Sequence, residues 1–433
     1  MKYIILAVSL LAYFAIDAQN QKEAPKFGIS FSGFVKTDVF FDTRQTVNIR
    51  EGHFLLYPDN VALDANNVDI NGTSSFNILS IQSRLRGAIT GPDAFNAKTS
   101  GILEADFFGN AGSGLDDVNG FRLRHAFVKL NWKSTELLVG QYWHPMFIAE
   151  SFPGVLSFNT GAPFQPFSRN PQIRITKTLG KLKLIGTVFS QRDFTSIGPE
   201  YTFVNGLYTS ATAASSKYLR NAVVPNMHIQ AHFNPKSTEH LIGIGVDYKT
   251  LLPEIYTVNI AGNKRFVSTK KIGSTSAIAF SQLKFKPITV KFESVYAQNA
   301  TDLTMLGGYA VSQTNNAETG AKDFTNMNTF SCWADANTNG EKIQFGLFAG
   351  FTKNMGSDKT IKTNTYYARG TNIDKVYRIA PRVVFISGKL DIGLEIEHTA
   401  ATYGKIAVNT KAELTELKPV ENTRALLAVT YKF

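Results

Sequence analysis

Charged side chains recur two positions apart along extended and otherwise apolar segments of this 433-residue chain. Successive side chains of a β-strand point to opposite faces, so such a pair puts two charges on one face of a strand. Guanidinium and carboxylate groups arranged in this way can attract or repel small ions, or they can pair with each other. The candidate residues are Lys36, Arg84, Arg86, Glu104, Asp106, Arg122, Arg124, Arg174, Arg378, Arg382, Glu395 and Glu397.

Covalent catalysis finds little support in the residue pattern. A hydrolase needs a nucleophile, a base and an orienting group, and the chain has neither a GxSxG nor an HExxH motif. His228 and His232 share a strand face, but a zinc ion there would lack further ligands. The single cysteine, Cys332, excludes an intramolecular disulfide. We therefore expect no enzymatic reaction and no cofactor, with an outer-membrane hydrolase on a β-barrel as the alternative.

The net charge of +11 raises nucleic acid as a partner. The basic residues are spread over alternating positions and form neither a run nor a basic helix. This distribution argues against a nucleic-acid partner.

The elements that must carry these charges are strands. From residue 28 onward, segments of about ten residues with alternating polarity follow one another, and helical periodicity is almost absent. A tilted strand of about 9 to 11 residues is long enough to cross a bilayer. The sixteen expected strands are 31–42, 78–90, 99–108, 121–132, 136–143, 172–179, 182–191, 227–233, 240–251, 272–285, 288–298, 327–336, 343–352, 376–387, 390–398 and 424–433.

The connections alternate between tight turns and long polar loops. The long loops are expected at about 45–76, 143–171, 193–225, 252–271, 299–326, 353–374 and 399–423. This alternation is typical of an all-β fold, a transmembrane antiparallel up-and-down β-barrel of about 16 strands, with short periplasmic turns and long extracellular loops. A soluble secreted β-sandwich that binds a ligand is the alternative.

Side-chain parity predicts which face meets lipid. Leu394 and Ile396 lie on one face of their strand, and Glu395 and Glu397 lie on the other. A charge facing lipid at mid-membrane costs roughly 2 to 4 kcal/mol, so the charged face must line a lumen. Aromatic residues near strand ends, Trp143 among them, fit the interfacial girdles of such a barrel.

The first residues predict export. Lys2 is followed by an apolar run and by small residues up to Ala18, as in a secretory signal peptide. We expect a signal peptide at 1–18 and one barrel domain at 19–433 in the outer membrane of a bacterial cell.

Residues 121–147, reading FRLRHAFVKLNWKSTELLVGQYWHPMF, resemble the phosphate-selective and DcaP-like porins of Gram-negative bacteria. Arg122, Arg124, Phe127 and the strand end at Gly140 carry the likeness. The resemblance implies a sixteen-stranded, trimeric porin whose third outer loop bends inward to narrow the pore. His125 and the insertion-rich first loop depart from the family pattern.

The third outer loop, 143–171, fits an inward position by its own chemistry. It has five phenylalanines and few charges, so it should prefer a sheltered surface. Packing against a neighbouring subunit is the alternative. Its polar candidates are His144, Glu150 and Arg169.

A sixteen-stranded barrel leaves an aqueous channel, so passive diffusion of small hydrophilic solutes is the expected function. The arginines outnumber the nearby acids, which favours anions, unless they only pair with Glu104, Asp106, Glu395 and Glu397 to stiffen the wall. The expected partners are outer-membrane lipid and lipopolysaccharide, further copies of the chain in a homotrimer, and small anionic or polar solutes.

Overall fold

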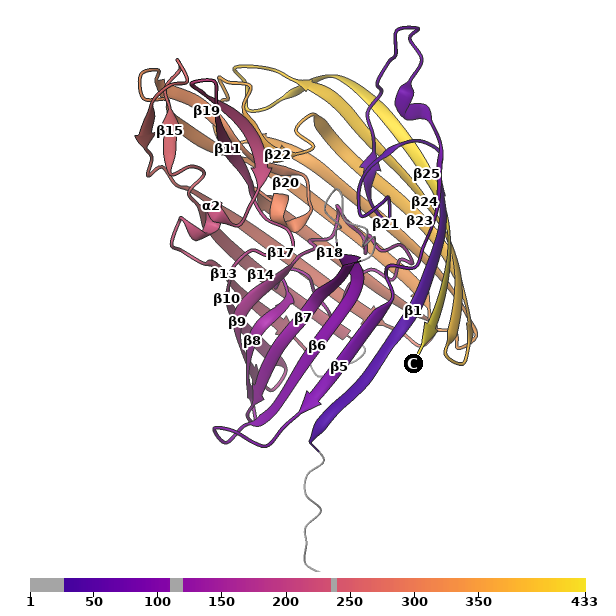
Figure 1. Cartoon of the computed structure of the whole chain (residues 1–433). Coiled ribbons are helices and arrows are strands. Elements are labelled where there is room, and N and C mark those ends of the chain that lie inside the picture. Colours follow the sequence, from indigo (N-terminus) through magenta and orange to yellow (C-terminus); the bar gives the residue numbers. More distant parts are fainter. Residues whose placement is uncertain (1–26, 110–119, 235–239) are drawn as a thin grey trace, which may run out of the picture.

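The wall of the molecule is a closed antiparallel up-and-down barrel of sixteen strands (Figure 1). The computed structural model describes residues 27–109, 120–234 and 240–433. β4 (Ser75–Leu79) and β5 (Arg84–Thr90) are two parts of one wall strand. The other wall strands are β1 (Gly28–Asp42), β6 (Lys98–Gly109), β7 (Gly120–Asn131), β8 (Thr135–Trp143), β9 (Arg169–Leu179), β10 (Leu182–Phe189), β13 (Asn226–Phe233), β14 (His240–Leu251), β17 (Ile272–Lys284), β18 (Ile288–Gln298), β20 (Ala321–Thr338), β21 (Ile343–Ser357), β23 (Ile373–Ser387), β24 (Leu390–Ile406) and β25 (Leu414–Lys432).

The barrel closes between its first and last strands. β1 pairs with β25 from Phe34 opposite Lys432 to Asp42 opposite Arg424. The terminal Phe433 exchanges two backbone hydrogen bonds with Gly33, at 3.1 and 3.3 Å. Closure leaves no sheet edge along this seam, as a membrane-spanning sheet requires.

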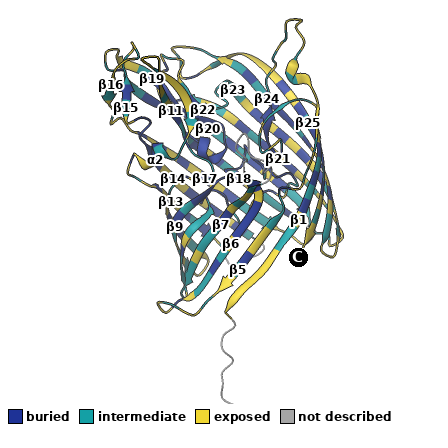
Figure 2. Cartoon of the chain, in the orientation of Figure 1, coloured by how far each residue is buried: buried dark blue, intermediate teal, exposed yellow. Residues whose placement is uncertain are grey.

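Exposure alternates along the wall strands, as the parity argument predicted (Figure 2). Leu394 is 49% exposed and its neighbour Glu395 is 1% exposed. The exposed residues form the outer, apolar surface and the charged ones face inward. A soluble sandwich would bury its apolar face, so this alternative is wrong and the barrel lies in the outer membrane.

The expected loop at 399–423 is wrong. β24 continues to Ile406 and β25 begins at Leu414, and the two strands stay paired over this stretch. Beyond the bilayer the outer face of a strand meets water and needs no apolar residues, so the backbone can remain paired after the apolar alternation has ended. Polar sequence therefore concealed the extension.

Short elements stand outside the wall. η1 (Ile70–Gly72), α2 (Lys217–Arg220) and η2 (Thr301–Leu303) are single turns of helix. None of the helices within 27–109, 120–234 and 240–433 is long and apolar enough to cross a membrane. The additional strands outside the wall are β2 (Thr46–Ile49), β3 (Phe54–Pro58), β11 (Ile197–Val204), β12 (Leu207–Ala214), β15 (Tyr256–Val258) and β16 (Arg265–Val267). β19 (Gly307–Asn316) and β22 (Tyr366–Arg369) extend the sheet of the wall, where β19 pairs with both β20 and β22.

The expected signal peptide at 1–18 lies outside the described residues. Export therefore stays a prediction from the sequence.

Candidate pore lining and constriction

The third loop, between β8 and β9, enters the barrel and binds charged residues of β24. The backbone N–H groups of Leu156 and Ser157 donate to the two carboxylate oxygens of Glu395, at 2.9 and 3.0 Å. The side-chain amide of Asn159 donates to Glu397 at 2.7 Å. These contacts tie the middle of the loop to the wall strand far from its own ends.

The same loop is anchored on other strands around the barrel. Lys36 of β1 donates to the carbonyl oxygen of Leu156 at 2.7 Å, and Lys291 of β18 donates to that of Phe152 at 2.9 Å. Near the start of the loop, Glu150 pairs with Lys183 of β10 at 2.7 Å. The loop therefore spans the lumen and contacts several of its sides.

The first loop also enters the lumen, which the sequence did not predict. All five residues of β3 are buried. Arg378 of β23 donates to the carbonyl oxygens of Leu56, at 3.0 Å, and of Ala162 in the third loop, at 2.9 Å. The hydroxyl of Tyr403 donates to the carbonyl oxygen of Pro58 at 2.7 Å. One buried guanidinium thus holds both loops.

Between these loops and the wall lies an apolar core inside the barrel. It joins Phe54 of the first loop and Phe164 of the third to Trp333 and Phe348 of the wall. Burial of aromatic rings contributes strongly to packing energy. The loops therefore form a packed filling along the β20–β25 side of the lumen.

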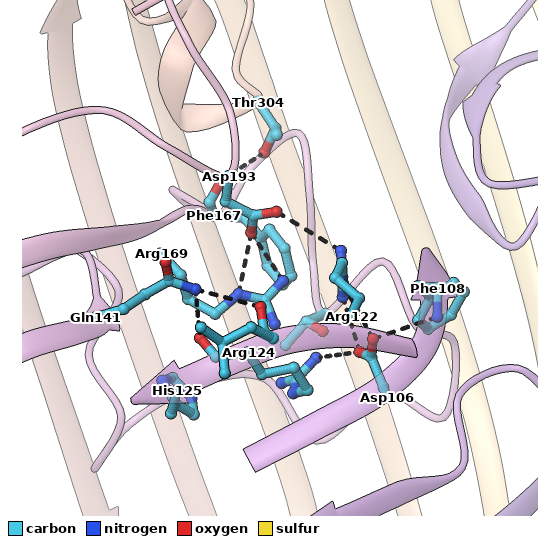
Figure 3. Close-up of polar contacts among 12 residues, drawn as sticks. Asp106, Phe108, Arg122, Arg124, His125, Gln141, Phe167, Arg169, Asp193 and Thr304 are labelled. Carbon is cyan, nitrogen blue, oxygen red and sulfur yellow. Dashed lines mark hydrogen bonds and ion pairs between the residues drawn. The ribbon is translucent and has the colours of Figure 1, made fainter. Parts of the chain in front are cut away.

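The opposite side, along β5 to β9, carries a network of paired charges (Figure 3). Arg122 of β7 binds Asp106 of β6 through two hydrogen bonds of 3.0 and 2.7 Å. Arg124 binds both Glu104 and Asp106 at 2.8 Å. Each carboxylate therefore serves as an acceptor for a neighbouring strand.

Asp193, in the fourth loop, extends this network (Figure 3). Its carboxylate lies 2.8 Å from Arg169 at the start of β9, 3.4 Å from Arg50 of the first loop, and 3.6 Å from Arg122. Burial opposes ionisation of Asp193, but Arg169, Arg50 and Arg122 together hold its pKa below the usual value. Neither Arg50 nor Asp193 was among the expected residues, because each lies in a loop without strand alternation.

Positive charge exceeds negative charge in this network, which we call the arginine cluster. Burial, followed by repulsion from Arg122, lowers the pKa of Arg50 to about 10. A nitrogen of Arg50 and one of Arg122 are buried without a hydrogen bond in the described structure. The cluster consists of five arginines and three carboxylates: Arg50, Arg84, Arg122, Arg124 and Arg169, with Glu104, Asp106 and Asp193.

A β-bulge in β7 concentrates side chains at this point. Glu104 pairs with His125 and the next residue, Ala105, pairs with Leu123, so Arg124 is an extra residue in the register. Arg124 and its neighbour His125 are both buried, at 2% and 5% exposure. Bulges redirect side chains in this way. Simple parity could not place two consecutive residues on the same face.

Trp143 lies inside the barrel. The prediction that it belongs to an aromatic girdle at the membrane interface is therefore wrong. Its ring stacks on Phe147 of the third loop at 3.8 Å, and the guanidinium of Arg169 lies 4.8 Å from its centroid. Trp143 therefore bridges the apolar filling and the arginine cluster.

Two cavities lie along the β7–β8 side of the lumen. The outer one, of about 280 Å³, is lined by Arg50, Arg122, Arg192 and Asp193 among others. The inner one, of about 430 Å³, lies nearer the periplasmic turns and is lined by Lys129, Glu136, Tyr142, Glu150, Arg174, Lys183 and His232, among others. Arg124 and His125 fall between the two along β7.

The remaining candidate residues divide between the two sides. Arg84 lies 3.6 Å from Glu104, and Arg86 is exposed on β5. Arg382 forms a two-bonded pair with Asp335 on β20, at 2.8 and 3.0 Å. The predicted charged residues therefore lie on both sides of the lumen and do not form a single ring around it.

The histidines form no metal site among the described residues. His144 accepts a hydrogen bond from the backbone of Met146 at 3.1 Å. His228 lies 3.3 Å from Asp247, and His232 contacts Gln230 at 3.0 Å. Each ring therefore has a protein partner at one nitrogen, while Nε2 of His228 and Nδ1 of His232 are buried without a hydrogen bond within the described chain.

Comparison with solved structures shows the fold of outer-membrane channels. The outer membrane channel DcaP of Acinetobacter baumannii is 14% identical, with a TM-score of 0.63 over 95% of this chain and 99% of that one. OmpT, an outer-membrane protein of Vibrio cholerae, is 8% identical, with a TM-score of 0.52 over 95% of this chain and 99% of that one. No protein-family model and no curated sequence matches the chain. The fold is therefore that of sixteen-stranded outer-membrane β-barrels.

Proposed function

We propose that this protein is an outer-membrane porin through which small hydrophilic solutes diffuse passively, and that it prefers anions. The observation that carries the proposal is the pair of cavities along β7 and β8, with the arginine cluster at the outer one. The DcaP channel supports a transport role by its fold.

The solute path in this proposal runs to one side of the barrel axis. The first and third loops fill the β20–β25 side with apolar and paired groups. Water and solutes need polar surroundings, which the β5–β10 side supplies. The third loop then acts as the constriction, with His144, Glu150 and Arg169 placed near its two ends.

Anion preference follows from the unequal charge of the arginine cluster. Paired arginines contribute little field, but the cluster has two more arginines than carboxylates. A buried guanidinium nitrogen that makes no hydrogen bond gains an acceptor when an anion enters, because unsatisfied buried donors are costly. The cluster would therefore stabilise an anion at the outer cavity.

A homotrimer in lipid and lipopolysaccharide is the assembly that fits this proposal. One structure of OmpT from Vibrio cholerae, with a TM-score of 0.51 at 8% identity over 94% of this chain and 99% of that one, is of a trimer form. Unheated detergent gels of the purified protein, with chemical cross-linking, test the assembly; a band at the monomer position alone would contradict it.

The functional test is a planar-bilayer recording under a salt gradient. We expect discrete conductance steps. We also expect a reversal potential whose sign shows that anions cross more readily than cations. Replacing both Arg122 and Arg124 by Ala should lower the preference. Absence of conductance would overturn the porin proposal, whereas a cation-selective conductance would overturn only the anion preference.

A further inference from the structure

The hairpin formed by β11 and β12 stands on the extracellular side, as part of the long fourth loop (Figure 1). Among the described residues its two strands pair only with each other, from Ile197 opposite Ala214 to Val204 opposite Leu207. Asn205 and Gly206 form its turn, with positive φ values of 50° and 82°. A two-residue turn of this kind makes the flanking residues a hydrogen-bonded pair.

That turn fixes the direction of every backbone group in β12. Hydrogen-bonded and non-bonded pairs alternate along an antiparallel ladder, so the even-numbered residues of β12 point their N–H and C=O groups away from β11. One contact agrees with this assignment: the N–H of Tyr208 donates to the carbonyl oxygen of Gly262, at 2.6 Å. Farther along, Ser210 and Thr212 are exposed, and within the described chain no other segment pairs with their backbone.

This free edge lacks the usual protection against strand pairing. Edge strands are commonly blocked by charged residues, proline or a bulge. β12 reads LYTSATAA, with no charge and no proline, and its register is regular. β11 differs, because it carries Pro199 and contacts β22. Only one side of the hairpin is therefore open to another strand.

The surroundings of the edge are basic. The guanidinium of Arg265 lies 5.4 Å from the centroid of the Tyr208 ring, and Lys264 beside it is also exposed. Two acids of this region already have partners: Glu200 pairs with Lys217, and Glu254 accepts from Tyr201 at 2.6 Å. One further acid, Glu318, is exposed in the turn that contacts Ile260. The electrostatic field at the start of β12 therefore favours a negatively charged partner.

We propose that the free edge of β12 binds an extended, acidic segment of another polypeptide at the cell surface by strand addition. Main-chain hydrogen bonds to Ser210 and Thr212 would supply the affinity, and Arg265 and Lys264 would select the charge. A two-stranded hairpin is only marginally stable alone, so a third strand would also order it. This inference does not depend on the porin proposal.

The test uses fluorescent ten-residue peptides of alternating Thr and Val with Glu at both ends, and purified full-length protein in detergent. Fluorescence anisotropy should show saturable binding. N-methylation of alternate peptide nitrogens on the edge that faces β12 should weaken binding at least tenfold, because it removes the main-chain donors. Equal binding of the methylated peptide, or no saturable binding of the unmodified one, would overturn the proposal.

Matched variants locate the site. Thr212→Pro removes the edge N–H and should abolish binding, whereas Thr212→Ala keeps it and should bind as the wild type does. Arg265→Glu should weaken binding of the acidic peptide, and the effect should shrink at high salt. Heat-modifiable migration on a gel confirms that each variant has folded. Peptide binding that survives Thr212→Pro contradicts the proposal. Self-association of the wild-type protein that Thr212→Pro abolishes also contradicts it, because the edge would then bind a second copy of this chain.

Discussion

The two sides of the lumen use arginine in different ways. On β23, Arg378 is fully enclosed and donates to loop carbonyl oxygens, and Arg382 is matched by Asp335. On β7, Arg122 and Arg124 share carboxylates with arginines from other elements, and positive charge remains in excess. A buried arginine surrounded by acceptors holds structure together, whereas an arginine among other arginines provides an electrostatic field.

The largest expected effect comes from removing Arg378, which holds the first and third loops on the β20–β25 side of the lumen. Arg378→Ala leaves the loop carbonyl oxygens and Glu397 without their shared donor. Breaking a buried charge pair costs about 3 to 5 kcal/mol. We expect a lower midpoint of unfolding in urea, measured by the change in gel mobility. We also expect larger and noisier conductance steps, because both loops are released. Arg378→Lys is the control and should restore only part of the stability. Wild-type midpoint and conductance in Arg378→Ala would contradict the assigned role.

The next effect concerns the field on the open side. Arg50→Gln removes one excess positive charge at the outer cavity and leaves the wall strands unchanged, because Arg50 lies in the first loop. We expect the anion preference to fall about two- to fivefold at low salt and less at high salt, because screening shortens the reach of charge. Reversal potentials measure it. Arg382→Gln, on the filled side, is the matched control; an equal change in both variants would remove the distinction between the two sides.

A smaller effect is expected where the two sides meet. Trp143→Ala removes the ring that stacks on Phe147 and lies beside Arg169. Loss of aromatic packing of this kind costs about 3 to 5 kcal/mol in a closed core, and less here because Trp143 is only partly buried. Single-channel conductance should rise modestly while selectivity keeps its sign. A reversal of selectivity would show that Trp143, and not the cluster, sets the preference.

The smallest effect is expected at the exposed anchor of the third loop. Glu150→Gln breaks a pair with Lys183 in which the Glu150 side chain is half exposed. Exposed pairs contribute about 0 to 1 kcal/mol. Urea midpoint and conductance should both stay close to wild type. A loss as large as that of Arg378→Ala would place the main anchor of the loop at Glu150 instead.

The sequence by itself determined the wall. Alternation over about ten residues located all sixteen strands, and parity assigned Leu394 outward and Glu395 inward. These predictions succeeded because lipid imposes a strict rule on every second residue of a spanning strand. The rule ends at the bilayer surface, so the sequence predicts a loop where β24 and β25 in fact extend.

Only the tertiary structure decided what fills the lumen. Loops carry no periodicity, so nothing in the sequence placed β3 beside Arg378 or brought Arg50 and Asp193 to Arg122. The extra residue Arg124 reverses the alternation of inward and outward side chains within β7. A rule based on strict alternation cannot detect such a bulge. Chain-local rules set which residues face inward. Contacts between distant segments decided which of those charges hold the loops and which remain to meet a solute.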